Sequence, residues 1–207
     1  PAGRLALYFG SLYGEWFGWE YIDQAARMNP QVHFCLIGNP PLHLPIDLSE
    51  NVHLLGEKKI EALPAYLSGA EFCLLPFKPG QLSDSVSPIK VFEYLFMLKP
   101  VVSTRLQEVA GYPAVFPAEN EAEFARLCQD VTDQTIDKKQ INEFISQNSW
   151  FSRLHTIMGV GEEHNVSVII LIHNNREIIG RCINSLLENC SPYLADVIVV
   201  DNASEDG

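Results

Sequence analysis

The sequence has little positive charge and no long apolar run. Its 14 Lys and Arg residues are outnumbered by 26 Asp and Glu residues, so the 207-residue chain carries a formal net charge of −12. Such an acidic chain is poorly suited to following a nucleic-acid backbone or an anionic lipid surface. The longest mainly apolar run spans residues 166–172, whereas a transmembrane helix needs roughly 18 residues. We therefore expect no nucleic-acid partner and no integral membrane segment.

Cysteine is scarce, and its spacing indicates neither disulfides nor zinc. The five cysteines form no Cys-x-x-Cys pair, and the six histidines are scattered along the chain without a ligand cluster. Cys35 and Cys73 lie inside apolar runs, which is typical of buried free thiols. Free thiols, together with the lack of a signal peptide, favour a cytoplasmic protein.

Short apolar segments alternate with helical stretches. We expect strands at residues 5–9, 32–37, 52–55, 72–75, 101–103 and 114–116, and helices near residues 18–29, 60–68, 88–98, 121–131, 137–147 and 150–157. Strands without polar alternation are buried on both faces, as in a parallel sheet. The pattern predicts a doubly wound α/β fold, mostly parallel, whose ligands bind beyond the carboxyl ends of the strands.

The pattern predicts two domains, at residues 1–158 and 166–207, joined by a linker at 159–165. The second domain is an incomplete βαβ unit, with strands at 166–172 and 197–200. Such a unit cannot bury both faces of its first strand. We therefore expect it to pack on the first domain or to pair with a second copy of the chain, as a homodimer. Because the chain ends inside what looks like a motif, we interpret it as part of a longer protein.

A serine-rich loop leads into one predicted helix. Ser87 and Pro88 predict an N-cap followed by the first helical position. Free backbone N–H groups at a helix start suit a diphosphate, with hydroxyls from Ser85 and Ser87 and a charge from Lys90. Glu93, nearly two turns later, is suited to accept hydrogen bonds from ribose hydroxyls. The same residues also suit an ordinary surface loop and amphipathic helix, so both interpretations stay open.

A glycine-bearing loop follows the first strand. Gly10 allows the backbone to approach a ligand closely, although the loop lacks the Gly-x-Gly-x-x-Gly pattern of nicotinamide-binding proteins. We interpret the neighbouring Trp16, Phe17 and Trp19 as packing residues rather than as a stacking platform.

Eight short stretches follow one another in a recognisable order: YFGS (8–11), FCLIG (34–38), NVHLLG (51–56), LPAYLSGAE (63–71), LPF (75–77), SPIKVFEYL (87–95), KPVVST (99–104) and SWFSR (149–153). In order and spacing, residues 1–158 resemble the C-terminal, donor-binding domain of a GT-B glycosyltransferase of family 4, also called group 1. The resemblance implies that Glu93 holds the donor ribose and that a helix start lies beneath the diphosphate. It also implies a glycine loop facing the phosphates and a base resting after Gly56. The implied donor site comprises Gly10, Ser11, Glu57, Lys58, Ser85, Val86, Ser87, Pro88, Lys90 and Glu93.

Two departures from the family pattern concern charge. Many members carry a second glutamate eight positions before the ribose-binding one, where this chain has Ser85. Many also carry an Arg and a Lys after the first strand, whereas residues 11–19 contain neither. Lys78 or Lys90 is available to supply the missing positive charge.

The end of the chain carries a second resemblance. The stretches NVSVIILIHNNR (165–176) and VIVVDNASEDG (197–207) resemble the start of a family 2, GT-A glycosyltransferase, which implies that Asp201 contacts a base or ribose. No Asp-x-Asp metal motif occurs in the sequence. A divalent metal is expected only in a complete family 2 domain, and this segment by itself is expected to be inactive.

These resemblances imply part of a hexosyltransferase for polysaccharide or glycan synthesis, metal-independent and retaining in its GT-B half. They imply a nucleotide-sugar substrate, no cofactor in this chain, and an acceptor glycan held by an N-terminal domain outside it. Two alternatives stay open: a non-catalytic docking module for the family 2 domain, and a GT-B sugar-nucleotide epimerase. The isolated chain is expected to bind donor weakly and to turn over nothing. The sequence identifies no catalytic residue, base, sugar or acceptor.

Overall fold

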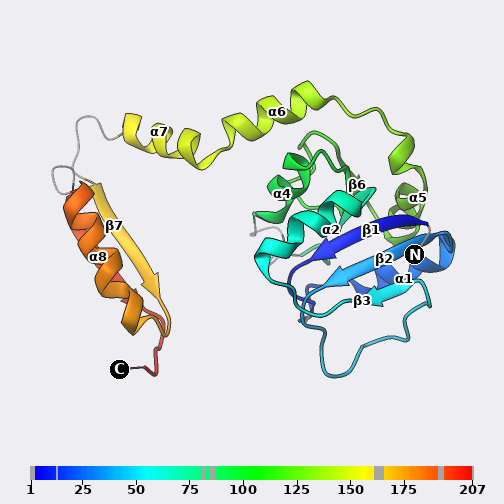
Figure 1. Cartoon of the computed structure of the whole chain (residues 1–207), viewed down its shortest axis with the longest axis horizontal. Helices are drawn as coiled ribbons and strands as arrows, with labels where there is room; N and C mark the ends of the chain where they lie inside the picture. The colour runs from blue at the N-terminus through cyan, green and yellow to red at the C-terminus, as the bar shows by residue number, and fades with distance from the viewer. Residues whose placement is uncertain are drawn as a thin grey trace. The chain divides into compact units, whose positions relative to one another are not determined.

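The computed structural model describes residues 3–12, 14–80, 83, 87–160, 166–190 and 194–206. The chain forms two units, Pro1–Gln147 and Asn148–Gly207 (Figure 1). The domain limits expected from the sequence, 1–158 and 166–207, stay predictions, and most of the expected linker lies outside the described residues.

The first unit is built on a six-stranded parallel sheet in the order β3-β2-β1-β4-β5-β6. Its strands are β1 (Arg4–Phe9), β2 (Val32–Ile37), β3 (Val52–Leu54), β4 (Phe72–Leu75), β5 (Val101–Thr104) and β6 (Val115–Ala118). The predicted doubly wound fold is confirmed. The chain order reverses between β1 and β4, and in open α/β sheets such a reversal opens a crevice at the carboxyl ends of the strands.

Helices connect the strands and cover both faces of the sheet; in Figure 1, α2 lies in front of the strands and α1 behind them. Tyr21 of α1 and Phe124 of α5 meet edge to face, with ring centroids 5.6 Å apart. Two short 3₁₀ turns, η1 (Ile60–Ala62) and η2 (Val131–Asp133), adjoin the α-helices. The α-helices of this unit are α1 (Trp19–Met28), α2 (Leu63–Gly69), α4 (Lys90–Phe96), α5 (Glu121–Asp130) and α6 (Lys138–Gln147).

The core of the first unit is formed by the strands and the inner faces of the helices. Cys35, Cys73 and Cys128 are buried within it as free thiols, as the apolar runs around the first two indicate. Tyr94, which is fully buried on α4, receives a hydrogen bond from the Phe9 backbone N–H at 3.3 Å. This contact fixes α4 to the carboxyl end of β1, where the strand order reverses.

The predicted start of α4 is wrong. The helix begins at Lys90 and its N-cap residue is Ile89, with no side-chain cap. The backbone N–H groups of Val91 and Phe92 bond three residues back, to the carbonyls of Pro88 and Ile89. This tight turn uses the backbone for capping, and the Ser87 hydroxyl donates to Glu108 Oε1 at 3.3 Å instead.

Two of the histidines that are scattered along the sequence meet in the fold. His33 on β2 and His53 on β3 approach each other, with Nδ1 and Nε2 2.9 Å apart. Desolvation and the neighbouring His33 ring lower the pKa of His53, which favours its neutral form. Within the described residues, no group of three or more His, Cys, Asp or Glu side chains is arranged to hold a metal ion.

The second unit contains the predicted βαβ arrangement. The strands β7 (Val166–Ile172) and β8 (Leu194–Asp201) pair in parallel and are connected by α8 (Arg176–Cys190), after the helix α7 (Trp150–Val160). The side chains of β7 alternate between half-buried and exposed, and Ile169 and Leu171 are each 69% exposed. Cys182 is also exposed, so the buried-thiol interpretation does not extend to it. Packing on the first domain, or homodimer formation through this unit, stays a prediction.

No helix within the described ranges combines the length and apolar character needed to cross a lipid bilayer.

Candidate functional site

Two glycines let the ends of β1 and β2 come unusually close. Gly10 (φ +138°) follows β1, and Gly38 (φ +147°) follows β2. The Gly10 N–H donates to the Ile37 carbonyl at 2.9 Å. A Cβ on Gly38 would lie 1.9 Å from the Gly10 carbonyl oxygen, and a Cβ on Gly10 would lie 2.3 Å from Lys90 Nζ. A side chain at Gly38 would overlap the backbone, whereas at Gly10 it would overlap only the end of the Lys90 side chain and would be strained by the positive φ. Glycine at both positions keeps the backbone of this loop uncovered on the ligand side.

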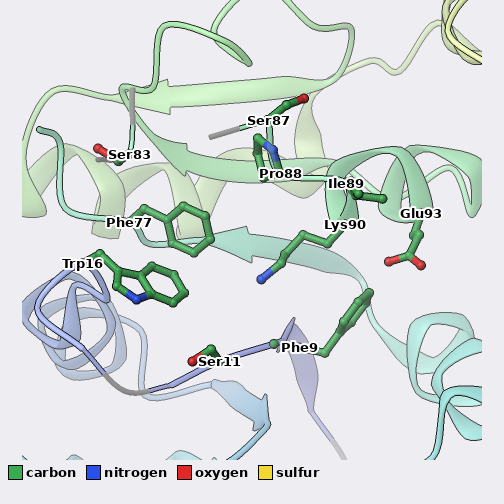
Figure 2. A pocket seen from close by; sticks show the side chains of 11 residues that line it. Phe9, Ser11, Trp16, Phe77, Ser83, Ser87, Pro88, Ile89, Lys90 and Glu93 are labelled. Carbon is green, nitrogen blue, oxygen red and sulfur yellow. The ribbon is translucent and has the colours of Figure 1, made fainter. Parts of the chain in front are cut away.

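A cavity of about 620 Å³ lies beside this loop, near the point where the chain order reverses between β1 and β4. This volume is typical of small-molecule sites. Figure 2 shows the Lys90 side chain extending into the cavity, with Glu93 beyond it and Trp16 with Phe77 on the opposite side. The lining residues come from the loops after β1 and β4 and from the start of α4: Phe9, Gly10, Ser11, Trp16, Phe77, Ser83, Ser87, Pro88, Ile89, Lys90 and Glu93.

Lys90 is held by aromatic and hydroxyl groups. Its ammonium donates to the Tyr8 hydroxyl at 3.0 Å, and that hydroxyl donates to the Ser11 carbonyl at 2.9 Å. The nitrogen also lies 4.4 Å from the Tyr8 ring centroid and 5.1 Å from that of Phe77, both within the range of cation–π attraction. None of the ion pairs among the described residues includes Lys90.

Burial shifts the acid–base behaviour of the cavity. Desolvation lowers the pKa of Lys90 to about 8, although the nearby Glu93 carboxylate opposes the shift. Desolvation also raises the pKa of Glu93, against the effect of Lys90. Tyr8 has its pKa raised by burial and stays neutral. Since a low-dielectric surrounding disfavours an uncompensated charge, an anionic ligand beside Lys90 would stabilise its charged form.

A smaller hollow of about 360 Å³ shares the loop 9–11 with the main cavity. It brings together two further residues of the implied donor site, Glu57 and Lys58, with Gly38 and Asn39. Asn39 Nδ2 donates to Glu57 Oε1 at 2.6 Å, and Lys58 Nζ donates to the Leu55 carbonyl. Two hollows on either side of one glycine loop therefore offer space for a ligand with two distinct ends.

The structure brings together most of the residues singled out from the sequence. Gly10, Ser11, Ser87, Pro88, Lys90 and Glu93 line the main cavity, while Glu57 and Lys58 line the smaller hollow with Gly10 and Ser11. Ser85 and Val86 lie outside the described residues.

Aromatic residues were the part of the cavity that sequence reasoning missed. The packing interpretation is confirmed for Phe17 and Trp19, which are buried. Trp16 is only half-buried and also lines the cavity, as do Phe9 and Phe77. The signal for Trp16 is weak in the sequence, because a tryptophan beside buried aromatics usually belongs to the core.

Asp201 has a local structural role at the end of β8. Its carboxylate accepts hydrogen bonds from the Ser204 backbone N–H, at 3.2 Å to Oδ2, and from the Ser204 hydroxyl. Asp206 accepts a hydrogen bond from the Arg176 N–H at 2.9 Å, at the start of α8. A hollow of about 670 Å³ is lined by Asp206 and residues 174–178 but not by Asp201.

Comparison with known proteins gives two family matches along the chain. The model for glycosyl transferases group 1 matches residues 3–134, and the model for glycosyl transferase family 2 matches residues 167–207. The chain is also similar to the putative teichuronic acid biosynthesis glycosyltransferase TuaH of Bacillus subtilis. The identity is 26% over 129 residues, which cover 58% of this chain and 32% of that protein.

Solved structures share the fold at low sequence identity. Anabaena Alr3699/HepE in complex with UDP matches with a TM-score of 0.53 and 16% identity, over 76% of this chain and 48% of that one. TarM matches with a TM-score of 0.51 and 14% identity, over 76% of this chain and 34% of that one. The chain therefore spans about a third to a half of the length of these proteins. From the family match over most of its length, we conclude that this chain belongs to the glycosyl transferases of group 1, with a segment at its end that matches glycosyl transferase family 2.

Proposed function

We propose that the first unit binds the nucleotide-sugar donor of a GT-B glycosyltransferase at the carboxyl ends of β1, β2 and β4. The observation that carries this proposal is Lys90, whose ammonium lies in a cavity with a hydroxyl and two aromatic rings around it and no carboxylate in an ion pair among the described residues. A diphosphate would supply the missing negative charge, and charge-assisted hydrogen bonds of this kind are strong.

The donor would extend across the cavity and the smaller hollow. Glu93, on the rim of the main cavity, would accept hydrogen bonds from the ribose hydroxyls, and the loop of Gly10 and Ser11 would face the phosphates. The base would rest in the smaller hollow beside Glu57 and Lys58. Ser87 and Pro88, just before α4, would approach the diphosphate from the helix side, while the roles of Ser85 and Val86 are taken from the family resemblance alone.

In such a transfer, an acceptor hydroxyl replaces the nucleoside diphosphate at the anomeric carbon of the sugar. The bond between that carbon and the phosphate oxygen breaks, and the diphosphate leaves with increased negative charge. Lys90 would stabilise this charge from a fixed position, which is worth more in a cavity than in water. We infer from the family that the transfer is a hexosyl transfer without a metal ion and with retention of configuration.

The wider role follows from the same family membership and from the named relative. We infer that an acceptor glycan is held by a domain outside this chain and that the complete protein takes part in polysaccharide synthesis in the cytoplasm. The family 2 segment would belong to a second transferase module, in which Asp201 contacts the nucleotide and a divalent metal assists.

The first test is calorimetric titration of the chain with UDP, GDP, ADP and CMP. UDP is the leading candidate, because the similar HepE structure is a complex with UDP. We expect one nucleotide to bind and the Glu93→Ala variant to weaken that binding at least tenfold, which corresponds to about 1.4 kcal/mol. Lys90→Met should weaken it by a similar factor.

Matched controls separate a site effect from a general charge effect. Glu143 and Lys139 form an ion pair on the surface of α6, and Glu143→Ala and Lys139→Met change the same charges outside the cavity. Both controls should bind nucleotide like the unmodified chain. If none of the four nucleotides binds, or if the controls lose as much affinity as the site variants, the donor-site proposal fails and the docking module is favoured.

A further inference from the structure

The end of the cavity opposite Glu93 is aromatic and rigidly held. Trp16 and Phe77 meet edge to face, with ring centroids 4.6 Å apart. Their loops are joined by backbone hydrogen bonds, from Lys78 N–H to the Trp16 carbonyl and from Gly18 N–H to the Pro76 carbonyl, each at 2.7 Å. Phe17 and Phe77 also form an isolated antiparallel bridge. The indole is thus fixed in place before any ligand arrives.

Trp16 has surface left for a ligand. It is half-buried, whereas Phe77 behind it is 4% exposed. No hydrogen bond of the indole Nε1 is found among the described residues, so this donor is available. Of the three serine side chains that line the cavity, two are engaged, since Ser83 donates to the Gly80 carbonyl at 2.9 Å and Ser87 donates to Glu108. This end therefore offers an aromatic surface together with the indole N–H and the Ser11 hydroxyl, neither of which is hydrogen-bonded within the described part of the chain.

The order of the groups in a nucleotide sugar indicates which of them would lie at the aromatic end of the cavity. The sequence of groups in such a molecule is base, ribose, diphosphate and sugar. In Figure 2, Lys90 Nζ lies between Glu93 on one side and the Trp16–Phe77 pair on the other. With the ribose at Glu93 and the diphosphate at Lys90, the group bonded to the second phosphate would lie against the aromatic pair, because the centroid of the Phe77 ring is only 5.1 Å from Lys90 Nζ.

We propose that Trp16, backed by Phe77, is the specificity-determining contact for the transferred sugar, and that it selects a hexopyranose with an apolar C–H face. This inference rests on the proposed donor site. The negative face of an aromatic ring attracts the slightly positive C–H groups of such a sugar face. The Nε1–H edge of the indole lies beside Gly14, and it would donate to a sugar hydroxyl that reaches that edge.

The test compares UDP with UDP-glucose and UDP-N-acetylglucosamine in binding to the unmodified chain and to Trp16→Phe and Trp16→Ala variants. We expect at least one of the two sugar nucleotides to bind more tightly than UDP. Trp16→Ala should lower that sugar nucleotide's affinity about fivefold or more and change the affinity for UDP less than twofold. Trp16→Phe should fall between the two, because it keeps an aromatic face and loses the N–H group.

Saturation-transfer NMR on the unmodified chain gives a second readout that does not depend on a variant folding. With saturation applied to the aromatic protons of the protein, the hexose C–H protons should receive strong saturation. An equal loss of UDP and UDP-sugar affinity in Trp16→Ala, or weak saturation of the hexose, would overturn the sugar contact while leaving the donor site intact. An absence of UDP binding to the unmodified chain would remove the donor site, and the sugar contact with it.

Discussion

The two units of this chain use nearly the same kind of strand with opposite results. Strand β2, VHFCLI, is buried at five of its six positions in a sheet of six strands. Strand β7, VSVIILI, is at least as apolar, yet its side chains alternate between half-buried and exposed in a sheet of two strands. A continuous apolar run therefore predicts a strand that is stable only when both of its faces are buried. Whether they are buried depends on the strands and helices around it.

The largest expected difference concerns matched leucines in the two sheets. Leu36 on β2 is fully buried, and Leu171 on β7 is 69% exposed. Leu36→Ala should lower the free energy of unfolding of the first unit by about 2–5 kcal/mol, whereas Leu171→Ala should change stability by less than about 0.5 kcal/mol. Urea denaturation followed by circular dichroism measures both. A loss near 2 kcal/mol for Leu171→Ala would instead favour a covered outer face of β7, as the expected packing or dimer requires.

Gly38 in the first unit and Gly180 in the second differ in the space around them, so replacing each with alanine should change stability in opposite directions. Gly38→Ala places a Cβ 1.9 Å from the Gly10 carbonyl oxygen at φ +147°, which should cost about 1–3 kcal/mol and displace the loop that faces the cavity. Gly180 lies within α8, and a Cβ there meets nothing within 4 Å. Gly180→Ala should stabilise that helix by about 0.5–1 kcal/mol. Thermal denaturation of both variants checks the opposite signs; destabilisation by Gly180→Ala would contradict the open surroundings of α8.

The pH dependence of nucleotide binding distinguishes the cavity of the first unit from an ordinary surface site. Desolvation lowers the pKa of Lys90 to about 8, while Glu93 opposes the shift and neutral Tyr8 adds no charge. A diphosphate binds the protonated amine better and raises its pKa in the complex. Affinity should therefore be highest near pH 7 and fall as the pH rises through 8, by up to about tenfold per unit.

The control for this prediction is Lys90→Met, which should bind nucleotide weakly and with little change between pH 7 and pH 9. Calorimetric titration at several pH values in buffers of different ionisation enthalpy also reports proton uptake on binding near pH 8. Equal pH dependence in Lys90→Met and the unmodified chain would assign the titration to another group.

The smallest expected effect is a difference in the rate at which the cysteines of the two units are alkylated. Cys73 and Cys128 are buried, and burial raises the pKa of both thiols, whereas Cys182 on α8 is exposed. Brief alkylation of the folded chain, read by mass spectrometry of its peptides, should modify Cys182 first and leave Cys73 and Cys128 intact. Early alkylation of Cys73 would show that the first unit opens readily, and protection of Cys182 would show that its surface on α8 is covered.

The strands of the first unit were predictable because a strand buried on both faces has a continuous run of apolar residues. The continuous apolar runs at β1, β2, β4 and β5 identify strands of a parallel sheet, and the structure confirms them. The start of α4 was not predictable in the same way. Ser87 and Pro88 match the usual capping pattern, but Ile89 precedes the helix and the Ser87 hydroxyl reaches Glu108 instead, a residue whose proximity depends on the tertiary fold.

The candidate site shows the same division. By itself, the sequence determined the parallel α/β fold, the family resemblance, and the residue types available for a donor, including Gly10, Lys90 and Glu93. Only the tertiary structure decided that Lys90 extends over Tyr8 and Phe77 and that Trp16 lines the cavity as well as packing in the aromatic cluster. The physical reason is that periodicity records whether a side chain needs burial, whereas the partners of a side chain are set by strand order and by loops that meet from distant parts of the chain.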